Sequence, residues 1–453
     1  MGKVFIVDTS VIMHDPQSPI ILADKDNVAV VPLPVLEELE HFKIMGNGKG
    51  FNAREAFRIL DELRKRGSLS TGVKTDMGGE VVVSTFEIKK FPDGMAKTND
   101  NRIILTALKL QKKDSDVKVV SKDRALRIKA EALGVESEDY ENDKVVRQVE
   151  ELYSGFKQVK LSSANDFVIS RIYQGPISAN TISGLEISAL YPNQCIEFVS
   201  SDSKTALAIF KKQDGKFLKV HKPKDLVDKK VWPINNEQAF ANALINDEEI
   251  SIVTLFGKAG TGKTLMALSV ACEFVGTEKY DQILVYRPNI EVGQQMGFLP
   301  GDIKDKFQPF MYPILDNLAR ILGKPQKSGK QKNMGEQKKG NFDMVNEYLE
   351  SELIVVEPIN FIRGRSLHNK IVIVDECQNL TPHEVKTLIT RAGVDTKVIL
   401  TGDPTQIDNP YVDFASNGLS HVIVRFMGQQ CFGNILLVKG ERSPLSELAS
   451  NIL

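Results

Sequence analysis

A glycine-rich segment lies between an apolar run and a helical pattern in the second half of the chain. The segment consists of Gly257, Lys258, Ala259, Gly260, Thr261, Gly262, Lys263 and Thr264. Glycines let successive backbone N–H groups close around phosphates, and the dipole of the following helix favours an anion. Residues 252–256 read as the preceding strand and residues 266–274 as the following helix. The sequence therefore predicts a phosphate-binding loop in an α/β domain, with ATP as its ligand.

Two loop residues and two later acids complete the expected nucleotide site. Lys263 is expected to reach the β- and γ-phosphates, and Thr264 to hold Mg²⁺. An apolar strand at 371–374 ends in Asp375 and Glu376. Asp375 is expected to hold the magnesium ion through water, and Glu376 to polarise the attacking water. A solvated acidic strand end is the alternative for these two acids.

The bulk properties of the chain place no strong bias on its partners. The formal net charge is -1, so any nucleic-acid surface must be local rather than global. No stretch approaches the roughly 20 apolar residues that span a bilayer, and the N-terminal apolar run meets Asp8 too early for a signal peptide. The four cysteines are widely separated, as expected in a reducing compartment: Cys195, Cys272, Cys377 and Cys431. We expect a soluble cytoplasmic protein without a membrane partner.

The first 140 residues alternate short apolar runs with helical patterns. Strands are expected at 4–7 and 117–120, and helices at 34–43 and 103–111. Such alternation predicts a parallel sheet with helices on its faces. Two glycine-containing segments are expected to be loops, at 46–50 and 67–79.

Four acids occupy positions in this region from which they can share a crevice. Asp8 and Asp123 follow strands, and ligand sites in parallel sheets form at the carboxyl ends of strands. Asp100 opens a helix, and Glu38 lies at the edge of a helix's apolar face, whereas Glu37 points into water. Converging carboxylates need a counter-charge, which a hard divalent cation such as Mg²⁺ or Mn²⁺ supplies. Alternatively these acids are helix caps and solvated ends.

The remaining chain divides into a middle region, 141–230, and a C-terminal region, 231–453. In the middle region, 167–172 and 206–210 read as strands, and Asp214-Gly215 predicts a hairpin. We expect a small β-rich connecting module whose role the sequence does not reveal. In the C-terminal region, the lysine-rich segment 324–340 predicts a surface loop. Contact with RNA is possible there, but a solvated face is the favoured interpretation.

The C-terminal motifs resemble a superfamily-one helicase core and, more closely, the PhoH family. The helicase-like marks are the phosphate loop, the Asp375-Glu376 strand end, and a Gly-Asp-Pro-x-Gln strand end that closes with Gln406. The PhoH marks lie at 287–288, 297–302, 361–367 and 375–379. The resemblance implies that Gln238 reads adenine and that Gln406 senses the γ-phosphate, although a polar loop glutamine would look similar.

Only one phosphate loop is present, whereas a working helicase normally uses two nucleotide-binding cores. Such a site needs an arginine to neutralise transition-state charge, an effect worth about 10³ to 10⁵ in rate. If a neighbouring subunit supplies it, the chain must assemble head to tail into a ring. The candidates are Arg442, or Arg363 or Arg365, each of which can equally be a surface arginine. The resemblance implies a hexamer.

The N-terminal acids resemble the site of the PIN domain, a metal-dependent ribonuclease fold. The matching residues are Asp8, Glu38, Asp100 and Asp123, with Thr9 or Ser10 as a supporting hydroxyl. The expected fold is α/β throughout: a PIN-like domain, the β-rich module and a RecA-like phosphate-loop NTPase domain. This fused PIN–PhoH architecture implies an ATP-dependent RNA helicase and Mg²⁺- or Mn²⁺-dependent endoribonuclease acting on single-stranded RNA.

Two other functions remain open from the sequence. The first is an ATPase switch whose PIN fold only binds RNA or protein. The second is a small-molecule kinase, in which RNA would not stimulate ATP turnover.

Overall fold

The computed structural model contains parallel sheets flanked by helices. It describes residues 2–44, 48–86, 88, 90–92, 94–111, 116–140, 152–226, 231–288, 303–323, 343–362, 364–409 and 412–440. Internal contacts divide the chain into two compact units. The first contains residues 1–144 with 410–413, and the second contains 145–409 with 414–453. The fold class is α/β, as the sequence predicts.

The first unit is built on a six-stranded sheet with the order β3-β4-β2-β1-β5-β6. Its strands are β1 (Val4–Val7), β2 (Val28–Pro32), β3 (Val73–Lys74), β4 (Glu80–Ser84), β5 (Val117–Val120) and β6 (Glu136–Glu138). The strand pairs are parallel except for the pair of β3 with β4. The central strands β1, β2 and β5 therefore end at the same edge, where Asp8 and Asp123 follow.

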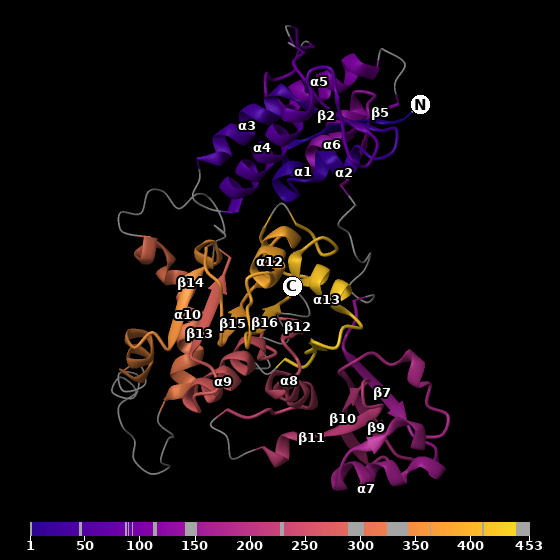
Figure 1. Ribbon diagram of the computed structural model, residues 1–453, viewed down its shortest axis with the longest axis vertical. Helices are drawn as coiled ribbons and strands as arrows, with labels where there is room; N and C mark the ends of the chain where they lie inside the picture. Colours follow the sequence, from indigo (N-terminus) through magenta and orange to yellow (C-terminus); the bar gives the residue numbers. More distant parts are fainter. Residues whose placement is uncertain are drawn as a thin grey trace. The chain divides into compact units, whose positions relative to one another are not determined.

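Except between β3 and β4, helices separate these strands along the chain (Figure 1). They are α1 (Thr9–His14), α2 (Ser18–Leu22), α3 (Leu33–Lys43), α4 (Gly48–Arg66), α5 (Asn99–Gln111) and α6 (Arg124–Ala132). The predictions of helices at 34–43 and 103–111 are confirmed. The two predicted loops are wrong in part, because 48–50 begin α4 and 67–79 contains β3. Residues 45–47 lie outside the described residues.

The middle region forms an open sheet with the order β7-β9-β10-β11-β8. Its elements are β7 (Phe156–Lys160), α7 (Phe167–Gln174), β8 (Ile177–Ser178), β9 (Gln194–Val199), β10 (Thr205–Lys211) and β11 (Lys216–Val220). The hairpin at Asp214-Gly215 is confirmed. The strand predicted at 167–172 is wrong, since this segment is helix α7. Its buried residues Val168, Ile169 and Ile172 have helical spacing, which the β-branched character of the run obscured.

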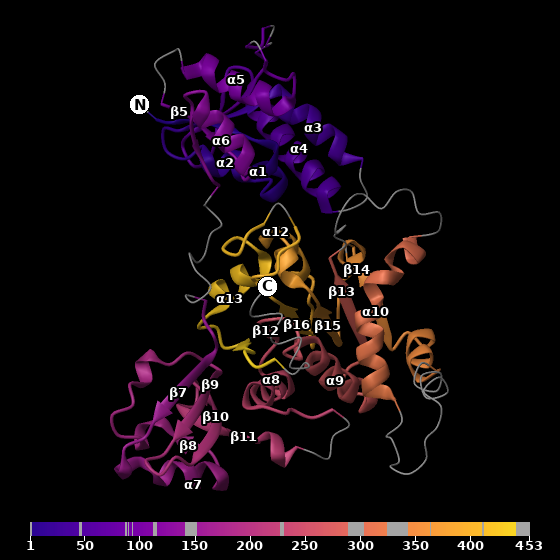
Figure 2. The ribbon, with the colours of Figure 1, turned by 180° about the vertical axis from the view of Figure 1, so that it is seen from behind.

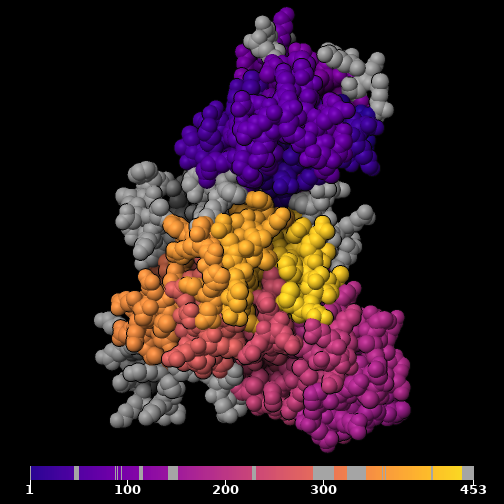
Figure 3. Space-filling view, in the orientation of Figure 1, coloured from indigo at the N-terminus to yellow at the C-terminus, as the bar shows by residue number. Residues whose placement is uncertain are grey.

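The middle sheet is not an independent body. One face packs on α7, whereas Cys195 and Ile209 from the other face share a core with Phe240 and Val253 of the C-terminal region. Asn434 also donates its side-chain amide to the carbonyl of Tyr153. Atoms of the two regions adjoin in the space-filling view (Figure 3). The contacts therefore place both regions in one unit, and the three-part division of the sequence stays a prediction.

The C-terminal region is a parallel sheet with the order β14-β13-β15-β16-β12-β17. Its strands are β12 (Ile252–Phe256), β13 (Gln282–Arg287), β14 (Ile354–Pro358), β15 (Lys370–Val374), β16 (Lys397–Gly402) and β17 (Phe432–Leu436). Strands predicted at 252–256 and 371–374 are thus confirmed, and β16 is the strand that ends at the Gly-Asp-Pro-x-Gln motif. The alternating residues of β12 face two separate cores, one containing Val253 and the other Ile252.

Helices cover both faces of this sheet (Figures 1 and 2). They are α8 (Asn236–Asn246), α9 (Lys263–Gly276), α10 (Ile303–Leu322), α12 (Pro382–Ile389) and α13 (Gly418–Phe426). Helices α8, α9 and α10 contribute to the core that contains Val253, and α12 and α13 to the opposite core. Among the described helices, none combines the length and apolar character needed to cross a membrane. The segment 324–340 lies outside the described residues.

Candidate active sites

The glycine-rich segment forms a loop between β12 and α9. Gly257, Gly260 and Gly262 have φ angles of 138°, 84° and 89°, a region that side-chain-bearing residues rarely adopt. A β-carbon on Gly257 would also lie 2.0 Å from the carbonyl oxygen of Leu437. The glycines are therefore required by the backbone path. Lys263 begins the helix that follows, so the loop presents a helix N-terminus as expected of a phosphate site.

The expected magnesium ligands lie next to each other at the carboxyl ends of the strands. The Thr264 hydroxyl donates to Oδ1 of Asp375 at 2.7 Å. Thr401, at the end of β16, donates to the same oxygen at 2.7 Å. The Asp375 side chain is buried. A threonine hydroxyl beside a carboxylate is a hard-oxygen pair that fits Mg²⁺.

Glu376 is held beside this pair in an unusual backbone conformation. Its φ is 56°, a left-handed conformation that costs roughly 1 to 3 kcal/mol for a non-glycine residue. Gln378 donates to Oε2 of Glu376 at 2.7 Å. Burial and the charge of Asp375 raise the pKa of Glu376, although Gln378 and nearby cations act in the opposite direction. A carboxylate with a raised pKa suits a general base.

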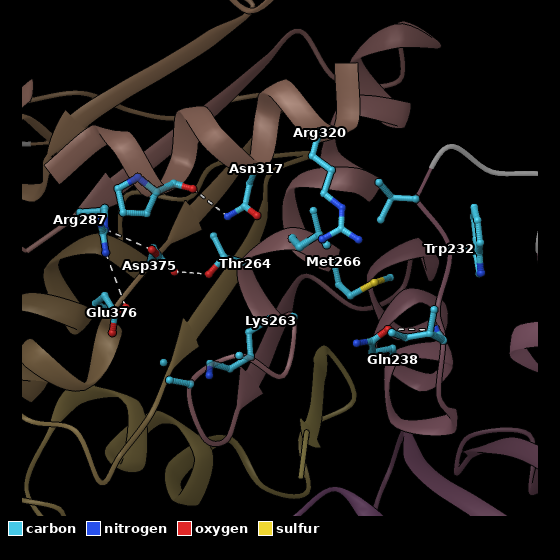
Figure 4. Close-up of a pocket in the computed structure, with 18 residues that line it drawn as sticks. Trp232, Gln238, Lys263, Thr264, Met266, Arg287, Asn317, Arg320, Asp375 and Glu376 are labelled. Atoms are coloured by element: carbon cyan, nitrogen blue, oxygen red, sulfur yellow. Dashed lines mark hydrogen bonds and ion pairs between the residues drawn. The ribbon is translucent and has the colours of Figure 1, made fainter. Parts of the chain in front are cut away.

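A pocket of about 600 Å³ extends from these acids along the phosphate loop. Its loop residues are Ala259, Gly260, Gly262, Lys263 and Thr264. Figure 4 shows Arg287, Asp375 and Glu376 at one end of the pocket and Trp232 and Gln238 at the other. The phosphate-binding groups and the expected adenine-reading group therefore occupy opposite ends.

Gln238 and Lys263 both contact the loop backbone. The Gln238 amide donates to the carbonyl of Thr261 at 3.0 Å and accepts from the N–H of Ile234 at 3.0 Å. The Lys263 ammonium donates to the carbonyls of Gly257 and Lys258 at 2.6 and 2.8 Å. Both side chains line the pocket, as their predicted roles require.

Other predicted residues of this site are not brought to the pocket. Gln406 is exposed and is absent from the pocket lining, while its carbonyl accepts a hydrogen bond from Gln378 at 2.9 Å. Arg365 pairs with Glu357 at 3.1 Å. Arg363 and Arg442 lie outside the described residues.

The sequence interpretation gave no role to three residues that contact the acids, namely Arg287, Gln378 and Thr401. Arg287 and Thr401 lie in the last positions of strands next to β15. Position at a strand's carboxyl end is the signal that would have found them.

In the first unit, the four predicted acids line a single pocket. These acids are Asp8, Glu38, Asp100 and Asp123, and Thr9 and Ser10 join them. Glu37 instead faces Arg102 at 3.8 Å with its side chain exposed. The helical argument that favoured Glu38 over Glu37 therefore agrees with the structure. The roles of these residues stay predictions.

Asp8 lies deepest in this pocket. Its carboxylate accepts hydrogen bonds from the N–H of Thr9 at 2.7 Å, from the Ser121 hydroxyl at 2.7 Å and from the Ser10 hydroxyl. Burial raises the pKa of Asp8, and these hydrogen bonds oppose the rise only in part. A positive ion in the pocket would favour its charged form.

The other three acids are more accessible. The Thr9 hydroxyl donates to Glu38, and Lys129 approaches Asp100 at 3.9 Å. Asp123 accepts from the N–H of Ala125 at 2.8 Å and caps α6, just as Asp8 caps α1. The capping and the pocket-lining interpretations therefore both hold for Asp8 and Asp123.

The chemistry of these donors fits Mg²⁺ or Mn²⁺, because carboxylates and hydroxyls are hard oxygen ligands. However, among the residues that the structure describes, no three acid, histidine or cysteine side chains are grouped closely enough to hold a metal. Asp139 is a further pocket-lining acid that the sequence interpretation missed; it follows β6 and lies 3.5 Å from Arg127. Its place after a strand could have revealed it.

Comparison with known proteins accounts for both units. A family profile described as PhoH-like protein matches residues 230–449, and a PIN domain profile matches residues 5–141. Protein PhoH2 of Bacillus subtilis is 38% identical, and the match covers 100% of both chains. The chain belongs to the PhoH2 family.

Two other PhoH2 proteins match along the whole chain. That of Thermobispora bispora is 31% identical and that of Mycolicibacterium smegmatis 30%, with 96% and 97% of those proteins covered. This PhoH2 chain is therefore a fusion of a PIN domain and a PhoH ATPase. The PIN–PhoH resemblance predicted from the motifs is confirmed.

Proposed function

We propose that this PhoH2 protein is an ATP-driven RNA helicase and a metal-dependent endoribonuclease. The observation that carries the proposal is the presence of two separate phosphate-directed sites. One is the loop with Thr264 and Asp375, and the other is the pocket lined by four carboxylates. The fused architecture joins them in one chain, so we infer that ATP turnover delivers single-stranded RNA to the nuclease.

At the ATPase site, each group has a separate task. Lys263 and the loop N–H groups bind the phosphates, and Thr264 and Asp375 would hold Mg²⁺, which supplies positive charge next to the γ-phosphate. Glu376 would orient the attacking water and take its proton. Gln238 would bind the edge of the adenine at the far end of the pocket.

At the PIN site, Asp8, Glu38, Asp100 and Asp123 would hold Mg²⁺ or Mn²⁺. The ion would supply an activated water and stabilise the leaving oxygen during phosphodiester cleavage. The deep position of Asp8 makes it the central ligand, while Ser10 and Ser121 orient its carboxylate. Closure of the acids around the ion would complete the site.

A homo-oligomeric ring is part of this proposal. Movement along a strand needs two nucleotide-binding cores that bind the strand in turn. The chain has one phosphate loop, so the second core would come from a neighbouring subunit. A hexamer is the expected size by family resemblance. Light scattering of the full chain with and without ATP measures it.

The central experiment measures cleavage of a labelled single-stranded RNA with Mg²⁺ or Mn²⁺, with and without ATP, and ATP hydrolysis in parallel. Asp8→Asn should abolish cutting and retain ATPase activity, and Lys263→Ala should do the reverse. Normal cutting by Asp8→Asn combined with Asp100→Asn would favour the switch in which the PIN domain only binds. Phosphate transfer to a metabolite without stimulation by RNA would favour a kinase.

A further inference from the structure

Arg287 is a largely buried cation in the ATPase pocket with no assigned role. It is the last residue of β13, which pairs in parallel with β15, so Arg287 lies beside the acids that follow β15. Its Nε lies 3.1 Å from Oδ2 of Asp375, and Nη2 lies 3.6 Å from Oε1 of Glu376. The Arg287 side chain is only 12% exposed.

This arrangement places the permanent positive charge of Arg287 next to Asp375, the carboxylate that would hold magnesium. The two oxygens of Asp375 have different partners: Oδ1 accepts from Thr264 and Thr401, and Oδ2 faces Arg287. With a divalent cation at Thr264 and Asp375, the carboxylate would share its charge with a second positive group. Asp375 would then attract Arg287 less strongly, and Arg287 would interact more favourably with an anion in the pocket. The phosphate loop lines the same pocket, so the phosphates of ATP would be that anion.

We propose that Arg287 supplies the transition-state positive charge from within the same subunit. In this role it acts as the arginine that the sequence interpretation sought in a neighbouring chain. The inference rests on the proposed ATPase function and deepens it. The ATPase site would then be complete in one chain, and a ring would be needed for strand movement rather than for hydrolysis.

The hydrolysis step balances with the groups of this one site. The oxygen of water forms a bond to the γ-phosphorus, and its proton passes to Glu376. The bond between the γ-phosphorus and the bridging oxygen breaks, and its electron pair leaves on ADP. Negative charge grows on the leaving and equatorial oxygens, where the guanidinium of Arg287 would donate hydrogen bonds.

Two other described arginines, Arg365 and Arg320, fit this role less well. Arg365 is paired with Glu357. Arg320, on α10, also lines the pocket, but Figure 4 shows it nearer Met266 than the acids. Arg287, by contrast, ends a buried strand and lines the pocket beside Asp375 and Glu376.

The first test compares the affinities for ADP and for ADP with aluminium fluoride, which mimics the transferring phosphoryl group. In the full-length Arg287→Ala variant, ADP affinity should stay within about threefold, while the extra affinity given by aluminium fluoride should be lost. The kcat for ATP should fall about 10³-fold. Arg287→Lys should restore only a small part, because an ammonium lacks the planar fork. Arg425→Ala, an exposed arginine on α13, is the matched control.

Two results of this test would overturn the proposal. Equal loss of affinity for ADP and for the aluminium fluoride complex would make Arg287 a positioning residue for the acids. An unchanged kcat would show that its charge is not needed.

The second test separates one-chain from shared sites by co-expressing Lys263→Ala and Arg287→Ala chains. If each active site combined Lys263 of one chain with Arg287 of a neighbouring chain, the mixed assembly would regain ATPase activity, because some sites would contain both residues. We expect no activity beyond the sum of the separate variants, whereas recovery would overturn the proposal. If the unaltered protein lacks ATPase activity, the proposed function itself fails. If it is active and Arg287→Ala is equally active, only this inference fails.

Discussion

The two acidic pockets of this chain differ in the groups that lie beside their most buried carboxylates. At the ATPase site, Asp375 and Glu376 face Arg287, so the protein itself provides a counter-charge. In the PIN pocket, Asp8 accepts hydrogen bonds from neutral groups, including Ser10 and Ser121. Cations also line that pocket, and one of them, Arg127, lies 3.5 Å from Asp139, while Lys129 lies 3.9 Å from Asp100.

The two sites should therefore depend on a metal ion to different extents. At the ATPase site, Arg287 already offsets part of the negative charge of Asp375 and Glu376. Asp8 is buried with a raised pKa, and a cation in the pocket would favour its charged form. We therefore expect removal of metal to disturb the structure of the PIN pocket more than that of the ATPase pocket.

The largest expected effect is the loss of RNA cleavage in Asp8→Asn. Removal of the deepest carboxylate should reduce the single-turnover rate at least 10³-fold, or about 4 kcal/mol in the barrier, because metal-activated water is lost. Gel analysis of labelled RNA measures this rate, and ATP hydrolysis by the same sample is the control. Cutting at the original rate would show that the PIN pocket is not the nuclease site.

A somewhat smaller effect is expected for Glu376→Gln. This variant should bind ATP normally but hydrolyse it about 10² to 10⁴ times more slowly, since it cannot accept the proton. In the unaltered protein, the raised pKa of Glu376 predicts that kcat/KM increases with pH through a value above that of ordinary glutamate. A flat profile across weakly acidic pH would contradict the general-base role.

Trp232 offers a more moderate test at the opposite end of the ATPase pocket. It is the chain's only tryptophan, is 41% exposed and lines the pocket. If the base stacks on it, ATP should change its fluorescence, and Trp232→Ala should weaken ATP binding about tenfold, or about 1.4 kcal/mol. Competition against a labelled nucleotide measures the second effect. Tripolyphosphate, which has no base, should bind both proteins equally.

A change of only about 1 kcal/mol is expected in the stability of the PIN unit when Asp8 is replaced. Because the folded-state pKa of Asp8 is raised, the native state loses stability as pH rises through that pKa. Asp8→Asn should remove this cost and stabilise the PIN unit by about 1 kcal/mol at neutral pH. The gain should vanish below the usual aspartate range. Hydrogen exchange in β1 and β5 measures it, and greater stabilisation of the unaltered protein by Mg²⁺ is the companion result.

Local signals in the sequence identified most of the fold and both groups of acids. The loop at 257–264 requires glycines for reasons visible in the sequence, and strand ends located Asp8, Asp123 and Asp375. Arg287 and Asp139 also lie at strand ends, but the residues they contact depend on which strands are neighbours in the sheet. Strand order is a long-range property, and no local pattern specifies it.

The error at 167–172 has a different origin. Valine and isoleucine favour strands, yet tertiary packing selected a helix whose buried residues are Val168, Ile169 and Ile172. The shared core of the middle sheet and the ATPase was also not predicted, since Cys195 and Ile209 gave no sign of which surface would cover them.

That shared core has a practical meaning for dissecting the protein. Phe240 and Leu244 of α8 are buried in it together with Leu207 and Val220. A shortened chain that begins near residue 231 would expose these apolar side chains to water and tend to aggregate. Shortened versions that keep the ATPase should therefore begin before residue 152, so that both layers fold together.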